Sequence, residues 1–246
     1  MTVLCILNQI IYPQFASNSN YNAYFLIEDF YGYSGIKPRA YQDYMDVVGP
    51  ANPTLWRMLN VKYVVVEKPG MFEGFAPIFT NEKTVVYKNE NMLPRAYFVN
   101  KVEKKKPIEM LNAIKSSSID PKDVAFVEEE LKVDQPDSTS YSLIKDYKEA
   151  KTIVEVNATG NNFLFFGNTF HPGWKASIDG NETSIHKTNH GFIGIVVPRG
   201  KHIVEFRYAP ESFFITKNIA LVLSSLVVFG LIITLALELR KKKSIK

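Results

Sequence analysis

Residues 219–237 read IALVLSSLVVFGLIITLAL and are followed directly by ELRKKK at residues 238–243. The nineteen residues of this stretch carry no charge, and only Ser224, Ser225 and Thr234 are polar. A helix of this length reaches ~28 Å, close to the ~30 Å hydrocarbon core of a bilayer. A buried core helix seldom runs this long without a polar face. The stretch therefore predicts a transmembrane helix, which we place at residues 217–239.

The basic residues that follow the span predict its orientation. Arg240 to Lys243 would stay in the cytoplasm, because basic residues beside a span are retained there. The tail 240–246 is then cytoplasmic, and the bulk of the chain lies on the extracytoplasmic side of the plasma membrane. The first residues, MTVLCILNQIIYP, have neither a basic segment nor a small-residue cleavage site. We therefore expect upstream transmembrane helices of the same protein, with residues 1–20 as the remnant of that upstream region.

The composition argues against a nucleic-acid partner and against an intramolecular disulfide bond. The chain has 246 residues and a formal net charge of +4, which the cluster at 240–243 alone accounts for. The remainder is nearly neutral, so the sequence predicts membrane lipid as a partner of the tail and no nucleic acid. The single cysteine, Cys5, excludes an intramolecular disulfide. The 17 Phe and 13 Tyr suit a β-rich domain with a well-filled core.

Residues 21–137 predict a small extracytoplasmic α/β domain. Asn52 and Pro53 suit the cap and the first turn of a short helix at 51–60. The β-branched run at 61–66 ends at Lys68-Pro69-Gly70, which is typical of a buried strand. A Tyr- and Gly-rich loop at 29–46 is expected to run into a helix, and 135–139 to be a linker. The remaining predicted elements are a helix at 107–114 and strands at 24–27, 84–87, 95–99 and 123–127.

Residues 138–212 predict an extracytoplasmic antiparallel β-sandwich. Asp179-Gly180 is a two-residue hairpin signal, and Val204, Phe206 and Tyr208 alternate with charged residues. Short strands at such close spacing are typical of a sandwich. The predicted strands are 141–147, 151–158, 162–167, 174–178, 182–186, 192–197 and 201–208. The fold class is therefore α+β: the small α/β domain, then the sandwich, then one C-terminal transmembrane helix.

The residues themselves nominate no catalytic group, no cofactor site and no metal site. His186 and His190 are four residues apart, but they span a strand end and a turn, where that spacing does not converge on a metal. His171-Pro-Gly-Trp174 predicts a tight turn that delivers Trp174 into the core, with a stacking platform for a sugar as the alternative. His171 and Trp174 are thus the only candidate glycan contacts. Asn157-Ala-Thr159 and Asn181-Glu-Thr183 are N-glycosylation triplets.

A set of short motifs occurs in a fixed order along the chain, from about residue 29 to the final span. The motifs are YSGIK at 33–37, YQDY at 41–44, LNVKYVV at 59–65, VYKN at 86–89, LPRAYFV at 93–99, NTFHPGWKASIDG at 168–180, PRGKH at 198–202 and FRYAP at 206–210. This set resembles the C-terminal part of YfhO-like bacterial membrane proteins. His171 departs from the pattern, since an aromatic residue is usual before Pro-Gly-Trp.

The resemblance implies a polytopic glycosyltransferase of the GT-C class, which uses lipid-phosphate-linked sugars outside the cytoplasm. In that class the catalytic loops lie between early transmembrane helices, so no catalytic residue is carried over and this chain alone is expected to be inactive. The chain would assist acceptor or glycan recognition in cell-envelope glycosylation, with a glycan or a polyprenyl-phosphate sugar as its partner. The alternatives are a non-catalytic, membrane-anchored carbohydrate-binding module and a purely structural cap. The sequence upstream of Met1 would discriminate among them.

Overall fold

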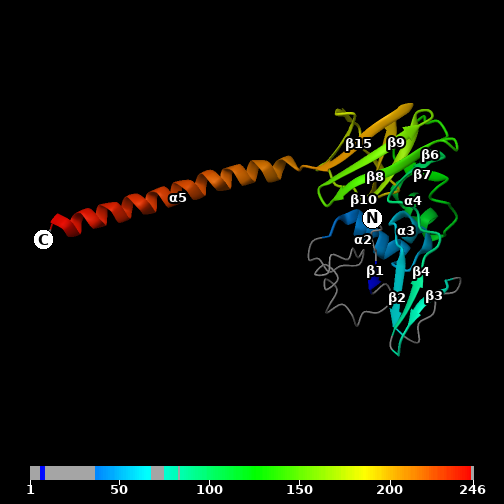
Figure 1. The fold of residues 1–246 in the computed structure, drawn as a ribbon, viewed down its shortest axis with the longest axis horizontal. Coiled ribbons are helices and arrows are strands. Elements are labelled where there is room, and N and C mark those ends of the chain that lie inside the picture. The colour runs from blue at the N-terminus through cyan, green and yellow to red at the C-terminus, as the bar shows by residue number, and fades with distance from the viewer. Residues whose placement is uncertain (1–5, 9–36, 68–74, 83, 245–246) are drawn as a thin grey trace.

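The computed structural model describes residues 6–8, 37–67, 75–82 and 84–244. It contains a small sheet, a β-sandwich flanked by short helices, and one long helix that leaves the rest of the molecule (Figure 1). The predicted α+β class is confirmed. The strand predicted at 24–27 and the first part of the loop predicted at 29–46 lie outside the described residues.

Two sheets face each other in the sandwich. One sheet has the order β13-β14-β10-β5 and the other β12-β11-β15-β9-β8. Buried side chains from both sheets fill the space between them, and the ring of Phe166 stacks on that of Phe206 with centroids 4.4 Å apart. The strands are β5 (Ala96–Val99), β8 (Tyr141–Lys148), β9 (Lys151–Ala158), β10 (Asn162–Thr169), β11 (Trp174–Ile178), β12 (Asn181–Thr183), β13 (His186–Thr188), β14 (Phe192–Val197) and β15 (Gly200–Tyr208).

The strand predictions for the sandwich are confirmed with one exception. The bounds of β9, β11 and β14 agree with the prediction, and Asp179 and Gly180 form the predicted hairpin turn with φ of 50° and 84°. The single strand predicted at 182–186 is wrong. The chain crosses between the two sheets there, because Thr183 pairs with Ala176 in one sheet whereas His186 pairs with Gly194 in the other. Two short strands, β12 and β13, result.

The small sheet lies at the opposite end of the molecule from the sandwich (Figure 1). Its order is β1-β2-β4-β3, and β1 pairs with β2 in parallel. Both β1 and β3 were absent from the sequence-based prediction, and β3 is exposed along its whole length. The strands are β1 (Ile6–Asn8), β2 (Tyr63–Glu67), β3 (Pro77–Thr80) and β4 (Thr84–Lys88).

Short helices close the core between the small sheet and the sandwich. Asn52 caps α3 (Pro53–Met58) as predicted, since its Oδ1 accepts the N–H of Leu55 at 2.9 Å. The helix α2 (Arg39–Asp43) continues into the π-helix η2 (Tyr44–Val48). The helix α4 (Pro107–Lys115) joins two strands that pair in parallel, β6 (Lys101–Lys104) and β7 (Val124–Val127).

One hydrophobic core is shared across the division predicted at residues 137 and 138. Strand β5 pairs with β10 inside the sandwich, so residues 96–99 complete a sheet built mainly from later residues. The shared core holds buried side chains from η2, α3, α4, β5, β7, β10 and β14. The sandwich therefore packs directly on the helices that precede it.

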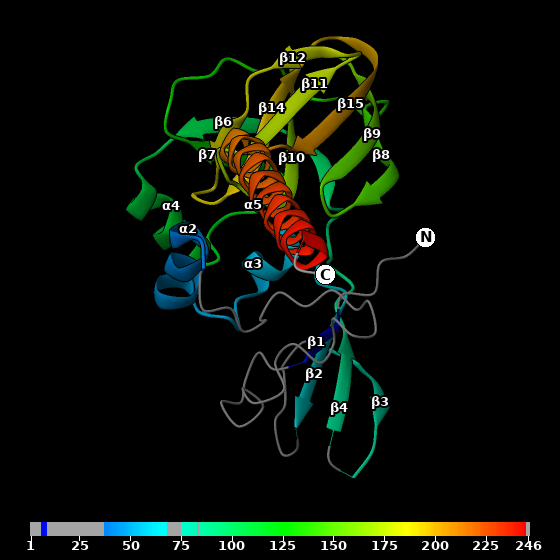
Figure 2. The ribbon, with the colours of Figure 1, turned by 90° about the vertical axis from the view of Figure 1, so that its left-hand side faces the viewer.

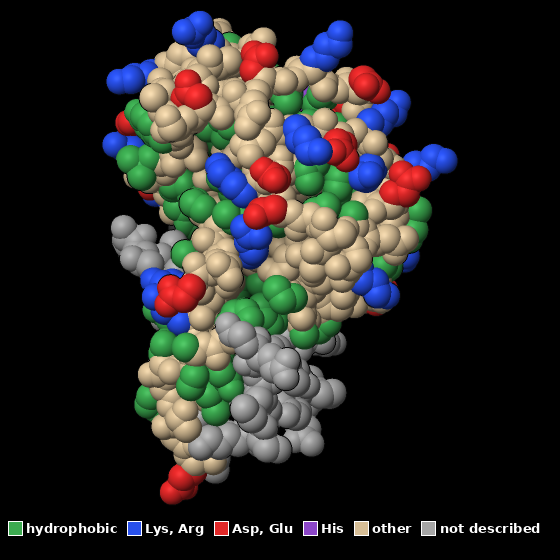
Figure 3. Space-filling view, turned by 90° about the vertical axis from the view of Figure 1, so that its right-hand side faces the viewer, with side chains coloured by type: hydrophobic (Ala, Val, Ile, Leu, Met, Phe, Trp, Pro, Cys, Tyr) green, Lys and Arg blue, Asp and Glu red, His purple; other side chains and the backbone are tan. Residues whose placement is uncertain are grey.

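The last element is the helix α5 (Glu211–Ser244). Residues 211–235 form a stretch long and apolar enough to cross a membrane, and none of its described residues is buried. It begins immediately after Ala209 and Pro210 and points away from both sheets (Figure 1), as the end-on view in Figure 2 also shows. On the opposite face of the molecule, acidic and basic side chains are intermixed (Figure 3).

Candidate functional site

The turn His171-Pro-Gly-Trp174 leads into β11 and is held by local hydrogen bonds. The N–H of Trp174 donates to the carbonyl of His171 at 2.9 Å, and the N–H of Gly173 donates to His171 Nδ1 at 3.0 Å. Glycine is needed at position 173, because an added Cβ would lie 2.9 Å from the Cβ of Pro210. The turn is therefore packed against the residues that lead into α5.

Trp174 is half-buried, because its side chain packs on the sandwich core and is also partly exposed at the surface. One side packs on the sandwich core, with its ring edge-on to Phe166 at 6.2 Å. Ala176, two residues along the strand, is buried on the inner face, as the alternation predicts. The other side of the indole contacts Tyr208, with centroids 5.4 Å apart.

His171 is exposed and reaches the same tyrosine. Its ring lies 5.4 Å from that of Tyr208 at an interplanar angle of 67°, and the Tyr208 hydroxyl lies 3.3 Å from His171 Nδ1. The two candidate glycan contacts are thus brought together through Tyr208, which the sequence did not single out. The reason is the antiparallel register, which sets Tyr208 opposite Trp174.

A hollow of ~400 Å³ opens beside Trp174, and we call it the Trp174 pocket. Its polar lining consists of Lys175, Glu182, Thr183 and Ser184. Among the described residues, the Glu182 carboxylate has no hydrogen-bond or ion-pair partner, whereas Lys175 Nζ lies 3.2 Å from a Glu211 oxygen. The full lining is Trp174, Lys175, Ala176, Glu182, Thr183, Ser184 and Ile185.

The chemistry of the Trp174 pocket suits a hydroxyl-rich ligand. An aromatic ring offers a stacking surface for the C–H face of a sugar, and a carboxylate and hydroxyls offer acceptors and donors for its hydroxyl groups. Sequence reasoning found Trp174 but missed Glu182 and Thr183, which lie within the triplet 181–183. The signal that would have found them is the hairpin at Asp179-Gly180, because it folds that triplet back onto β11.

The remaining histidines each have a separate carboxylate partner. His186 Nδ1 contacts Glu129, whereas His190 is buried and its Nε2 lies 2.8 Å from Asp43 Oδ2. The two imidazoles that are four residues apart in sequence therefore face different elements. Within the described residues no cluster of three potential metal ligands occurs.

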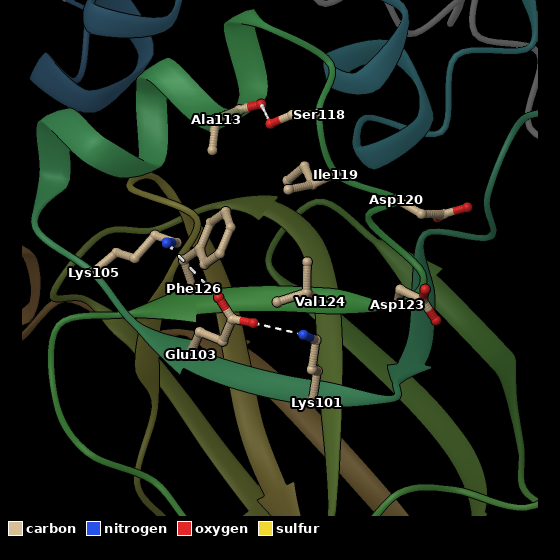
Figure 4. A pocket seen from close by; sticks show the side chains of 10 residues that line it. All are labelled: Lys101, Glu103, Lys105, Ala113, Ser118, Ile119, Asp120, Asp123, Val124 and Phe126. Carbon is tan, nitrogen blue, oxygen red and sulfur yellow. Dashed lines mark hydrogen bonds and ion pairs between the residues drawn. The ribbon is translucent and has the colours of Figure 1, made fainter.

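A second hollow lies between α4 and the pair β6 and β7 (Figure 4). Its charges are paired with one another: Glu103 lies 2.7 Å from Lys101 Nζ and 3.8 Å from Lys105 Nζ. Asp120, at its far side, pairs with Arg57 at 3.0 Å. Because these charges compensate one another, this groove offers a ligand less free polar chemistry than the Trp174 pocket.

Within the described residues, the structure joins a sheet-rich portion to one helix that is long and apolar enough to span a bilayer. Residues 130–220 match the family described as bacterial membrane protein YfhO, and this segment contains β8 to β15 and the start of α5. The resemblance to YfhO-like bacterial membrane proteins is thereby confirmed over the sandwich. No curated protein and no solved structure shows a match to the chain.

Proposed function

We propose that this chain forms the extracytoplasmic C-terminal portion of a polytopic, glycosyltransferase-like membrane protein and assists glycan recognition in cell-envelope glycosylation. The observation that carries the proposal is the Trp174 pocket, whose lining includes an indole and an unpaired carboxylate and whose Lys175 contacts the first turn of α5. The match to the YfhO family supports the membrane setting.

The expected ligand is a sugar carried on a polyprenyl phosphate or at the end of a membrane-linked glycan. A stacking ring and hydrogen-bonding groups recognise the sugar, and the position next to α5 suits a substrate that is itself held in the bilayer. Catalysis belongs to other parts of the protein in this proposal, so the chain alone transfers no sugar.

The test is a titration of the full chain, reconstituted in lipid vesicles, with polyprenyl-phosphate glucose. Trp174 fluorescence is the readout, taken as the difference between wild type and Trp174→Phe, because the other tryptophan, Trp56, is buried at 1% exposure. We expect a saturable change with the sugar-bearing lipid and none with polyprenyl phosphate alone.

Glu182→Gln should weaken binding about tenfold, the effect of losing roughly 1.4 kcal/mol from a charge-assisted hydrogen bond. The matched control is Glu130→Gln, since Glu130 is also exposed but lies in the loop that follows β7. Equal binding by both variants would place the ligand elsewhere. Absence of any response to the sugar-bearing lipid would favour the alternative, a structural module on the membrane.

A further inference from the structure

Three aromatic side chains, His171, Trp174 and Tyr208, lie together at one end of the sandwich, and we call them the aromatic ridge. The same end of the sandwich gives rise to α5, because only Ala209 and Pro210 separate β15 from that helix. The aromatic ridge therefore lies beside the point at which the chain enters its apolar helix, and Figure 1 shows β15 leading into α5.

The connection between the aromatic ridge and α5 is short and held in place. The N–H of Ala209 donates to the carbonyl of Gly173 at 2.7 Å, inside the turn that carries His171 and Trp174. Pro210 packs closely on the same glycine, and Lys175 pairs with Glu211 in the first turn of the helix. These contacts fix the aromatic ridge to the first turn of α5.

The apolar sequence of α5 sets the depth of this first turn. Glu211 precedes Ile219 by eight residues, which is ~12 Å along a helix. The headgroup layer adds ~5–8 Å on each side of the hydrocarbon core. Phe214, which is 49% exposed, then lies ~8 Å above the hydrocarbon core, at the outer edge of the headgroup layer. Phe213, which is 57% exposed, lies ~9 Å above the core, just outside that layer. The aromatic ridge, which is fixed at the level of Glu211, lies directly above that layer.

The chemistry of the aromatic ridge suits a lipid headgroup layer. Tryptophan and tyrosine are enriched at membrane–water interfaces, where the ring is partly apolar and its polar end stays hydrated. Charges at this end of the sandwich balance and are largely paired: Lys148 with Asp146, Lys151 with Glu205 and Lys175 with Glu211, at 3.2, 2.8 and 3.2 Å. The aromatic side chains therefore account for the attraction of this end of the sandwich to the headgroup layer, and anionic lipid is not required.

The geometry points to a membrane-contact surface: the aromatic ridge rests on the headgroup layer of the bilayer that α5 crosses. The sandwich is then held on the membrane surface instead of swinging on a flexible stalk. This inference depends on α5 as a span and not on the proposed glycan recognition. Where both hold, the Trp174 pocket opens just above the lipid headgroups.

The experiment uses the full chain in vesicles that contain lipids with a nitroxide on the choline headgroup or, in parallel samples, at the middle of the acyl chain. The readout is the Trp174 fluorescence, again as the difference between wild type and Trp174→Phe. We expect a larger loss of fluorescence with the headgroup nitroxide than with the mid-chain nitroxide. The loss should be the same in zwitterionic vesicles and in vesicles that contain anionic lipid.

Two controls report on specificity. The signal of Trp56 in the Trp174→Phe variant should not respond, since that ring is buried. A fluorophore on Asn181→Cys in a Cys5→Ser background should respond weakly, because the hairpin tip lies at the other end of β11, ~13 Å away along the strand.

Either of two results would overturn the inference. Quenching of Trp174 by aqueous iodide but not by the headgroup nitroxide would mean that the aromatic ridge stands in water, clear of the membrane. Protection from both quenchers would mean that protein covers it, such as other spans of the same protein. Sugar binding measured in the absence of nitroxide lipid is unaffected by either result, so the two proposals fail separately.

Discussion

Asn189 and Phe126 exchange two hydrogen bonds between the β13–β14 turn and strand β7. The N–H of Phe126 donates to Asn189 Oδ1 at 2.7 Å, and the N–H of Asn189 donates to the carbonyl of Phe126 at 2.8 Å. Asn189 is fully buried and has φ of 50°, a conformation that asparagine adopts more readily than most residues. Its carbonyl also accepts the hydroxyl of Tyr44. One residue, through its backbone and its side chain, thus ties the sandwich to strand β7 and to the π-helix η2 that precede it.

Asn189→Ala should destabilise the fold strongly. The substitution leaves the buried N–H of Phe126 without an acceptor, which costs ~1–3 kcal/mol, and it places alanine at a positive φ. The measurement is urea denaturation of the full chain in detergent micelles, followed by Trp56 fluorescence. Asn161→Ala, at the exposed β9–β10 turn, is the control and should unfold like wild type. Equal midpoints for the two variants would show that Asn189 does not join the two parts.

Trp174→Ala should be less destabilising than Phe206→Ala. Phe206 is fully buried and stacked on Phe166, so its removal should cost ~3–5 kcal/mol. Trp174 is half-buried, and its removal should lower the melting temperature by a smaller amount. Calorimetry of both variants in the same detergent checks the order. A Trp174→Ala protein that melts like wild type but no longer binds polyprenyl-phosphate glucose would make Trp174 a recognition residue without a packing role.

The orientation of the chain in the membrane is testable by cysteine labelling. In a Cys5→Ser background, a reagent that cannot cross membranes should modify Asn181→Cys but not Ser244→Cys in intact cells. The physical reason is the basic cluster at 240–243, because basic residues beside a span tend to be retained on the cytoplasmic side. Permeabilised cells are the control, because both positions should react there. The reverse pattern in intact cells would contradict an extracytoplasmic sandwich.

Asp179 should make the hairpin between β11 and β12 sensitive to acid. Its Oδ2 lies 2.6 Å from His202 Nδ1 and its Oδ1 accepts the N–H of Ile203 at 2.8 Å. The hydrogen bond from His202 lowers the pKa of the Asp179 carboxyl below its usual value. The stabilisation is therefore complete above the unfolded-state pKa of ~3.9 and is lost as the pH falls below it, through the lower pKa of the folded state.

The matching variant is Asp179→Asn, measured by urea denaturation at a series of pH values from neutral to strongly acidic. Asp179→Asn should be less stable than wild type at neutral pH and should lose less stability on acidification. Glu130→Gln, in an exposed loop, should show the same dependence of the free energy of unfolding on pH as wild type. If the free energy of unfolding of Asp179→Asn depended on pH as that of wild type does, the acid sensitivity would belong to other carboxyl groups.

Local sequence determined the elements whose cause lies within a few residues. Nineteen uncharged residues followed by a basic cluster indicate a span, and α5 has the corresponding apolar stretch. Asn52 before Pro53 indicates a capped helix start, and Asp179-Gly180 indicates a hairpin, because side-chain caps and positive φ angles are short-range requirements. Alternation along β9 and β11 likewise indicates which side chains face the core.

Only the tertiary structure decided which distant residues meet. The antiparallel register sets Tyr208 beside Trp174, and the crossing between the sheets splits the strand predicted at 182–186 into β12 and β13. Strand β5 completes a sheet whose other strands follow it by sixty residues or more, as the pairing of Phe163 with Val99 shows. Strand pairing depends on partners supplied by the whole chain, and packing selects among registers that a local pattern leaves equivalent. For this reason the sequence located Trp174, whereas the fold supplied the tyrosine beside it and the carboxylate on the neighbouring strand.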